Sequence, residues 1–225
     1  MKALRVILIA GLAVAMDSGR AGKPNNPDFG FPAPGTYALP PLQPAADGVV
    51  LTSEGRASTL HRVFSGKIVI LSFIYTQCSD ARGCPLASAV LAQLRRRVDE
   101  DPALSQRVRL ISLSFDPAHD TPAVMRGYGV RFAPEGADWQ FLTVDSEAAL
   151  QPILNGYRQT RQKAYDTNGT FTGTYSHLLR VFLIDERKVI RNIYSADFLD
   201  PTLLFHDIIT LARQCCRQSQ SAWSR

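Results

Sequence analysis

The sequence predicts an α/β sandwich, in which a parallel or mixed sheet is covered by helices. Two mainly apolar runs, 67–75 and 108–115, have the pattern of strands that are buried in a sheet, and the first is β-branched and apolar almost throughout. A segment with the periodicity or the caps of a helix follows each run. Near the C-terminus, two further strand patterns are separated by a short polar turn and followed by one last helical segment.

The first strand and helix flank a loop that contains two cysteines. Residues 67–75 (KIVILSFIY) form the predicted central strand. After the loop, Pro85 lies where a helix begins, because proline is favoured in the first turn of a helix. The pair Asp101-Pro102 ends this helix. Between these points the apolar residues recur at helical spacing, namely Leu86, Val90, Leu94 and Val98.

The same order is repeated after this helix. Residues 108–115 (VRLISLSF) form the second strand, and Asp120 or Thr121 can cap a helix that has Pro122 in its first turn. Residues 139–144 form a third strand. The next helix has a serine cap and a proline that is expected to kink or shorten it, at Ser146 and Pro152.

The last elements complete the pattern of a thioredoxin-like sandwich. Residues 178–184 and 189–194 form a predicted hairpin, and a helix runs from Asp200-Pro201 to near Gln214. Alternating strand and helix units, followed by a hairpin and a final helix, are the order of a thioredoxin-like domain. An additional N-terminal β-hairpin is predicted around residues 49–59.

The N-terminus has the features of an export signal. Lys2 and Arg5 precede an apolar run at residues 6–15, which ends in small residues that suit a signal peptidase. We predict a signal peptide over residues 1–15. We favour it over an uncleaved membrane anchor, because about ten apolar residues are too few for a helix to span a bilayer core of about 30 Å. The mature protein is therefore expected to be periplasmic or secreted, where cysteines can pair.

Composition divides the rest of the chain into three parts. Residues 16–46 form a predicted Pro-rich linker or arm, because seven of the 14 prolines lie between Pro24 and Pro44. Residues 47–214 form the predicted thioredoxin-like domain, and residues 215–225 form a polar tail. The net charge of +5 is too small to predict a nucleic-acid partner.

Two cysteines, Cys78 and Cys84, lie in the loop between the predicted central strand and its helix. Ligand-binding and catalytic groups gather at such strand ends. Cys84 stands at the helix cap, where the helix dipole favours the thiolate that binds metals or attacks disulfides. Gly83 helps the five intervening residues to bring both sulfurs to one ion or to each other. The alternative is a structural disulfide, but a loop this short gains little stability from one.

One of the four histidines completes a candidate metal site. His177 comes just before the strand at 178–184, in a Gly- and Thr-rich loop that faces the cysteine loop in a thioredoxin-like arrangement. His61 and His206 are interpreted as structural, and His119 has a weaker case for lining the site. Two thiolates suit Cu(I), and an added imidazole also allows Cu(II), whereas zinc normally takes a fourth ligand.

Three segments of the chain resemble the Sco/SenC family, which are copper-binding thioredoxin-fold proteins that assist the assembly of cytochrome c oxidase. The motifs are specific when they occur together, and the resemblance spans roughly residues 47–213. The three segments are residues 67–94 (with KIVILSFIYTQC and CPLASAVLAQL), 111–122 (ISLSFDPAHDTP) and 176–185 (SHLLRVFLID).

This resemblance implies a copper site and its partners. By matching, Cys78, Cys84 and His177 are the copper ligands, and Asp116 of the Asp-Pro motif has a supporting role. The implied partners are a copper-receiving protein, such as a respiratory oxidase subunit, and a thiol reductant protein. The chain departs from the family in one respect, because its cysteines are separated by five residues instead of three.

The alternative function within the same fold is that of a periplasmic thiol-disulfide oxidoreductase or peroxide-reducing enzyme, with Cys78 and Cys84 as catalytic residues. Against it, the Cys-x-x-Cys motif is missing, and residues 171–184 lack the proline that thioredoxins place beside their cysteines. We therefore favour a metal-binding chaperone over an enzyme. The adjacent Cys215 and Cys216 are interpreted as a solvent-facing pair or as incidental, because adjacent cysteines bridge each other only with strain.

Overall fold

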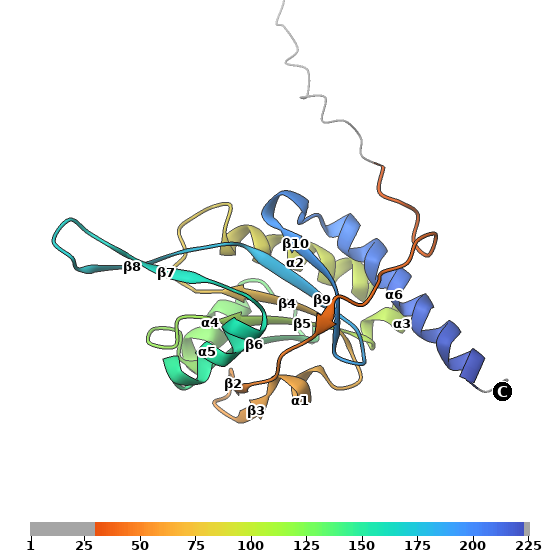
Figure 1. The fold of residues 1–225 in the computed structure, drawn as a ribbon, viewed down its shortest axis with the longest axis horizontal. Helices are drawn as coiled ribbons and strands as arrows, with labels where there is room; N and C mark the ends of the chain where they lie inside the picture. Colours follow the sequence, from red (N-terminus) through yellow and green to blue (C-terminus); the bar gives the residue numbers. More distant parts are fainter. Residues whose placement is uncertain (1–29, 223–225) are drawn as a thin grey trace, which may run out of the picture. The chain divides into compact units, whose positions relative to one another are not determined.

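The computed structural model describes residues 30–222 and confirms the α/β, thioredoxin-like fold (Figure 1). Its main sheet has eight strands, in the spatial order β1 (Gln43–Pro44), β10 (Val189–Ser195), β9 (Arg180–Ile184), β4 (Ile68–Ile74), β5 (Val108–Ser114), β6 (Trp139–Thr143), β2 (Val49–Thr52) and β3 (Ala57–Thr59). Strands β4, β5 and β6 are parallel, and β9 runs antiparallel to β4. The sheet is therefore mixed, with the predicted central strand near its middle.

Helices connect these strands, and a smaller sheet extends from them. The helices are α1 (Leu60–Phe64), α2 (Cys84–Asp99), α3 (Pro102–Ser105), α4 (Pro122–Val130), α5 (Glu147–Gly156), α6 (Pro201–Ala222) and the short 3-10 helix η1 (Ala196–Phe198). Helices α2 and α6 pack against each other. Strands β7 (Arg161–Tyr165) and β8 (Phe171–His177) form a separate hairpin that projects from the domain (Figure 1).

Strand β4 lies at the centre of the core. Each of its seven residues is buried, as expected from a sequence in which only Ser72 is polar. On one face Phe73 packs against Tyr157 and Phe182, with ring centroids 5.3 and 5.9 Å away. These contacts join β4 and β9 to the end of α5. The loop that contains Cys78 follows β4, and His177 lies just before β9. Both candidate segments therefore adjoin these buried strands.

The helix caps agree closely with the sequence. Thr121 caps α4 by accepting a hydrogen bond from the N–H of Val124, so Asp120 is free for another contact. Ser146 caps α5. Pro152 lies inside α5 without ending it, and the helix stops after ten residues.

Some boundaries differ from those predicted. Residues 172–176 were expected to be a loop but belong to strand β8, because they pair with β7. The following strand begins at Arg180 rather than Leu178. Helix α6 continues to Ala222, beyond the predicted end near residue 214 and into the predicted polar tail. Helices α1 and α3 were not predicted, since four or five residues are too few to show a helical period.

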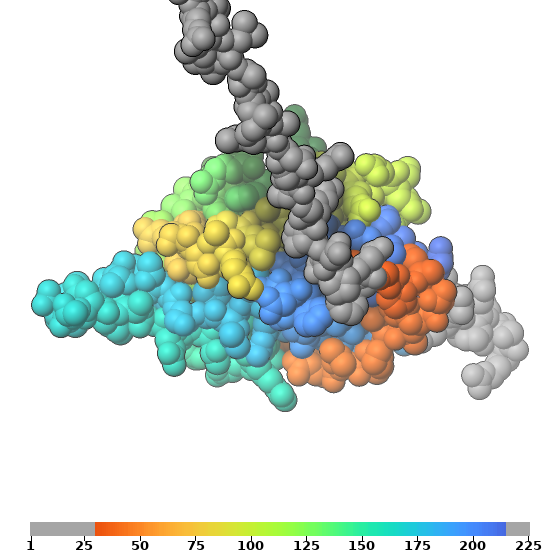
Figure 2. Space-filling view, turned by 90° about the horizontal axis from the view of Figure 1, so that it is seen from above, coloured from red at the N-terminus to blue at the C-terminus, as the bar shows by residue number. Residues whose placement is uncertain are grey.

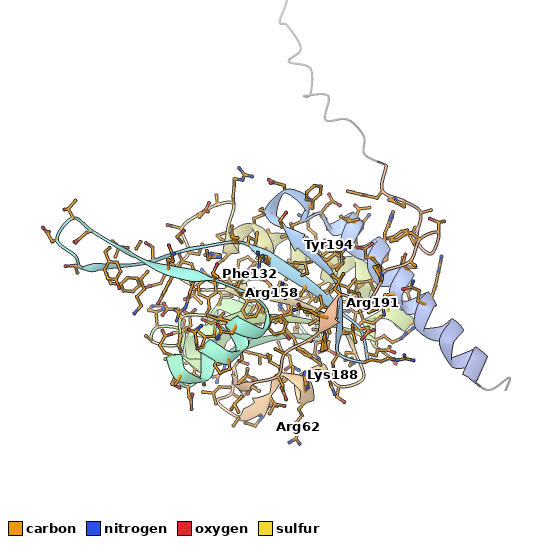
Figure 3. The ribbon with its side chains drawn as sticks, in the orientation of Figure 1. Arg62, Phe132, Arg158, Lys188, Arg191 and Tyr194 are labelled. Carbon is orange, nitrogen blue, oxygen red and sulfur yellow. The ribbon has the colours of Figure 1, made fainter. Side chains whose placement is uncertain are left out.

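The described part of the Pro-rich arm packs on the domain. Leu39 and Ala45 are buried, and β1 adds a short strand to the edge of the sheet beside β10. Tyr37 donates a hydrogen bond to the buried Asp207 of α6 at 2.5 Å. Arg191 of β10, which Figure 3 labels, donates to the carbonyl oxygen of Leu39. The chain therefore joins the sheet at Gln43, before the predicted start of the domain at residue 47.

Some predictions concern residues that the structure does not describe. The predicted signal peptide at residues 1–15 and the first part of the arm lie outside the described residues, as do the side chains of Cys215 and Cys216. Among the residues that are described, none of the helices combines the length and the apolar character needed to cross a membrane.

Candidate metal centre

The structure brings Cys78, Cys84 and His177 together at one end of the sheet. Their two sulfur atoms and a ring nitrogen all lie within 4.8 Å of one another. Cys84 is the first residue of α2, Cys78 lies in the loop after β4, and His177 is the last residue of β8. Figure 2 shows the loop around residue 80 (yellow) on the surface beside the segment around residue 177 (cyan). The fold thus joins residues that are 93 positions apart, Cys84 and His177.

Cys84 is the more firmly held of the two cysteines. It is buried, and its sulfur accepts a hydrogen bond from the backbone N–H of Tyr75 at 3.4 Å. The sulfur also lies 3.8 Å from Nε2 of His177. Because Cys84 begins α2, its sulfur is close to the unpaired N–H groups of the first helical turn. The sulfur is therefore positioned by both β4 and α2.

Cys78 is half-buried, and a turn absorbs the additional length of its loop. The side chain of Asp80 accepts a hydrogen bond from the N–H of Arg82 at 2.9 Å. The carbonyl oxygen of Asp80 accepts another from the N–H of Gly83, also at 2.9 Å. This turn folds the extra residues back, so the longer spacing still brings Cys78 beside Cys84.

The two thiols differ strongly in acidity. A hydrogen bond from Cys84 lowers the pKa of Cys78 to about 4, with a smaller contribution from His177. The same hydrogen bond, together with burial, raises the pKa of Cys84, so the thiolate that was expected at Cys84 from its place at the helix cap lies on Cys78 instead. At neutral pH the pair therefore keeps one proton, and the more accessible sulfur is the thiolate. The thiolate is the form of cysteine that can bind a soft metal ion.

Aromatic packing orients the imidazole of His177. The ring centroid lies 4.8 Å from that of Phe115 and 5.8 Å from that of Tyr75, both edge to face. Within the described part of the chain, Nδ1 is buried and has no hydrogen-bond partner. The direction of Nε2 toward Cys84 therefore depends on these rings rather than on a second hydrogen bond.

The rings of Phe115, Tyr75 and Tyr175 pack against one another and form an aromatic wall beside His177. Asp116 contacts this wall through Tyr175 and is not one of the three clustered residues. It is buried and accepts a hydrogen bond from the hydroxyl group of Tyr175 at 3.0 Å. The ring of Tyr175 packs edge to face on Tyr75 at 5.3 Å and on Phe115 at 5.8 Å. Burial raises the pKa of Asp116, and the hydrogen bond from Tyr175 opposes this shift. Asp116 thus contacts the wall of the site and not its sulfur atoms.

The other histidines lie outside the cluster. Nε2 of His61 is 2.8 Å from the carbonyl oxygen of Ala45, and Nδ1 of His206 is 3.1 Å from that of Pro32. Both rings therefore connect the arm to the domain. His119 lies instead beside Asp120, with Nδ1 3.0 Å from a carboxylate oxygen.

Asp120 is the residue of this region that the sequence analysis missed. It was expected only as a possible helix cap, but its carboxylate is fully buried and contacts Thr76 at the base of the cysteine loop. The sequence holds one signal for this contact. Thr121 already caps α4, so the neighbouring carboxylate needs a different partner.

Gly83 makes the close approach of Cys78 possible. A Cβ atom at residue 83 would lie 3.0 Å from the sulfur of Cys78 and 3.2 Å from the carbonyl oxygen of Asp80. We expect Gly83→Ala to displace the sulfur and to weaken metal binding about tenfold, the lower end of what changes around metal ligands cost. Competition with a chromophoric chelator measures the affinity. Gly127→Ala, at a site with no atom within 4 Å of the new Cβ, is the control, and equal affinities for both variants would contradict this prediction.

Comparisons with known proteins relate most of the folded region to one family. A sequence model of the family described as SCO1/SenC matches residues 50–213. A SCO1 protein homolog of Bacillus subtilis (strain 168) is 27% identical over 86 residues, which cover 38% of this chain and 42% of that protein. The matched region thus spans less than half of that relative.

Solved structures share the fold over most of their length. ScoI of Arabidopsis thaliana, solved with copper bound, has a TM-score of 0.64 and 22% identity, and the match covers 76% of this chain and 98% of that one. The apo Sco1 protein of Thermus thermophilus has a TM-score of 0.62 and 26% identity, and the match covers 80% of this chain and 97% of that one. A SCO1/SenC family lipoprotein of Bacillus anthracis has a TM-score of 0.65 and 22% identity, with 78% and 99% covered.

Proposed function

The chain belongs to the SCO1/SenC family, and from this premise we propose that it binds copper through Cys78, Cys84 and His177. The approach of two sulfur atoms and one imidazole nitrogen to within 4.8 Å of one another supports this assignment. Soft thiolates favour Cu(I), and the imidazole nitrogen extends the donor set to Cu(II). Asp116 has a supporting role in this proposal, because it holds Tyr175 in the aromatic wall beside His177.

Delivery of the copper to another protein is the second part of the proposal. A cavity of about 370 Å³ lies beside Cys78 and His177 and gives side chains of a recipient room to approach. The ion would leave by ligand exchange, as the recipient's thiols or imidazoles replace those of this chain. A respiratory oxidase subunit in the periplasm is the recipient we favour. A thiol reductant protein would keep Cys78 and Cys84 reduced, since disulfide sulfurs do not bind copper in this way.

His177→Ala tests the assignment of the three ligands. We expect the reduced variant to keep Cu(I) on its two sulfurs but to lose the stable Cu(II) complex, because the imidazole is the donor that suits Cu(II). Titration with Cu(II), followed by thiolate-to-metal absorption, measures this loss. His206→Ala, which changes a histidine bonded to Pro32, is the matched control. An unchanged Cu(II) spectrum in His177→Ala would remove His177 from the site.

Thiol redox chemistry is the second candidate function. Two observations favour it: Cys78 and Cys84 are free thiols, and Cys78 has a pKa lowered to about 4. Catalytic reduction of a model disulfide or peroxide by a metal-free protein that fails to bind copper would establish this alternative. Stoichiometric copper binding without such turnover would exclude it.

A further inference from the structure

The carboxylate of Asp120 accepts hydrogen bonds from the base of the cysteine loop on both of its oxygens. Oδ2 accepts from the backbone N–H of Thr76 at 3.0 Å, and Oδ1 accepts from the Thr76 hydroxyl group at 2.5 Å. Oδ2 also accepts from the hydroxyl group of Ser114 at 2.5 Å. Asp120 itself is fully buried. We name Asp120, Thr76 and Ser114 the carboxylate clamp.

The clamp acts on a turn that places Cys78. The N–H of Cys78 donates to the carbonyl oxygen of Tyr75 at 3.3 Å, which closes a turn with Thr76 as its second residue. The backbone N–H and the hydroxyl group of Thr76 both donate hydrogen bonds to Asp120. The preceding N–H, that of Tyr75, is held by the sulfur of Cys84. The consecutive N–H groups of Tyr75 and Thr76 therefore link the sulfur of Cys84 to the carboxylate clamp.

The rest of the loop is held more weakly. The turn at Asp80 is local, and the ion pair between Arg82 and Asp197 is about three-quarters exposed on both side chains, so it contributes little. Cys84 is fixed by helix α2, whereas Cys78 lies six positions earlier in the chain. The clamp is thus the main buried attachment of the Cys78 end of this lengthened loop.

We propose that Asp120 is a positioning residue, which sets the separation between the sulfurs of Cys78 and Cys84 by holding Thr76. The copper consequence of this inference depends on the proposed function, but the placement of the sulfurs does not. Asp120 touches neither sulfur, so it acts through the backbone of residues 76–78.

Thr76→Val tests the clamp without removing the buried carboxylate. The variant loses the hydroxyl hydrogen bond to Asp120 and the longer hydroxyl contact with Nδ1 of His119 at 3.4 Å, and it keeps the shape of the side chain. We expect copper affinity to fall about tenfold. Thr76→Ser restores the hydroxyl group and should restore the affinity. Thr210→Val is the matched control, because Thr210 is also buried and its hydroxyl accepts a hydrogen bond from Gly35 at 2.8 Å. Thermal unfolding of all three variants separates lost stability from lost positioning.

A metal-free measurement keeps the inference independent of copper. Equilibration with oxidised glutathione converts the two thiols to one protein disulfide and releases two molecules of reduced glutathione. We expect Thr76→Val, but not Thr210→Val, to shift this equilibrium toward the reduced protein, because a loosened Cys78 meets Cys84 less often.

The outcomes separate the two proposals. A wild-type protein that binds no copper would defeat the proposed function, and the glutathione equilibrium would still decide on the clamp. Thr76→Val with wild-type values in both measurements, or with losses equal to those of Thr210→Val, would overturn the positioning role. Asp120→Asn, which places an amide opposite Thr76, should exceed Thr76→Val in both effects if it folds, and a smaller effect would also count against the clamp.

Discussion

Cys84→Ser should reduce the affinity for Cu(I) by at least about a thousandfold, or about 4 kcal/mol. The substitution removes one of two soft ligands and leaves a hydroxyl group, which is a poor donor for Cu(I). It also removes the sulfur that accepts the N–H of Tyr75. Competition of the reduced protein with a chromophoric Cu(I) chelator measures the loss.

The same chain provides the matched control for this experiment. Replacing both Cys215 and Cys216 with serine also removes thiols. We expect it to leave the affinity within about twofold of wild type, because substitutions away from a site usually change free energies by no more than about 0.5 kcal/mol. If Cys84→Ser kept its affinity and the double variant lost it, the copper site would have to be reassigned to the C-terminal pair.

A second large effect concerns the acidity of Cys78. In the reduced, metal-free protein one thiol should titrate with a midpoint at pH of about 4. In Cys84→Ala the largest cause of the lowered pKa is absent, so the midpoint should rise by several units toward the ordinary value of about 8.5. The ultraviolet absorbance of the thiolate, followed against pH, measures both midpoints. Asp197→Asn, at an exposed carboxylate, is the control and should leave the midpoint in place.

This acidity also predicts how copper binding depends on pH. Above the pKa of Cys78 and below the raised pKa of Cys84, only the Cys84 thiol has a proton left to lose when both sulfurs bind the ion. The affinity should therefore rise about tenfold per pH unit through the neutral range. A rise of about a hundredfold per unit would mean that two thiol protons are released and that Cys78 is not a thiolate in the free protein.

The strands and most helices followed from local sequence. The run at residues 67–75 is apolar almost throughout because β4 is buried on both faces, and Thr121, Pro122 and Ser146 mark helix starts through their own backbone chemistry. The hairpin of β7 and β8 did not follow, since residues 171–177 (FTGTYSH) are mostly small and polar and gain their strand geometry from pairing with β7.

The candidate site shows the same division. Cys78, Cys84 and His177 were selected from residue type, spacing and a family resemblance, and their convergence required the topology that places β8 beside the loop after β4. The roles of Phe115 and Tyr75 in orienting the imidazole were not predictable, because an aromatic residue in a strand is ordinarily a core residue. Asp120 looked like a helix cap, and its bond to a residue 44 positions away appears only in three dimensions.

Taken by itself, the sequence determined the order of strands and helices, the donor atoms available for a metal and the loop that carries two of them. Periodicity, caps and residue chemistry are local properties, and they are written along the chain. Tertiary structure decided how closely His177 approaches the sulfurs, which sulfur keeps its proton and what anchors the base of their loop. Those properties depend on distances of a few ångströms between segments far apart in the chain, and only packing of the sheet, the helices and the hairpin sets such distances.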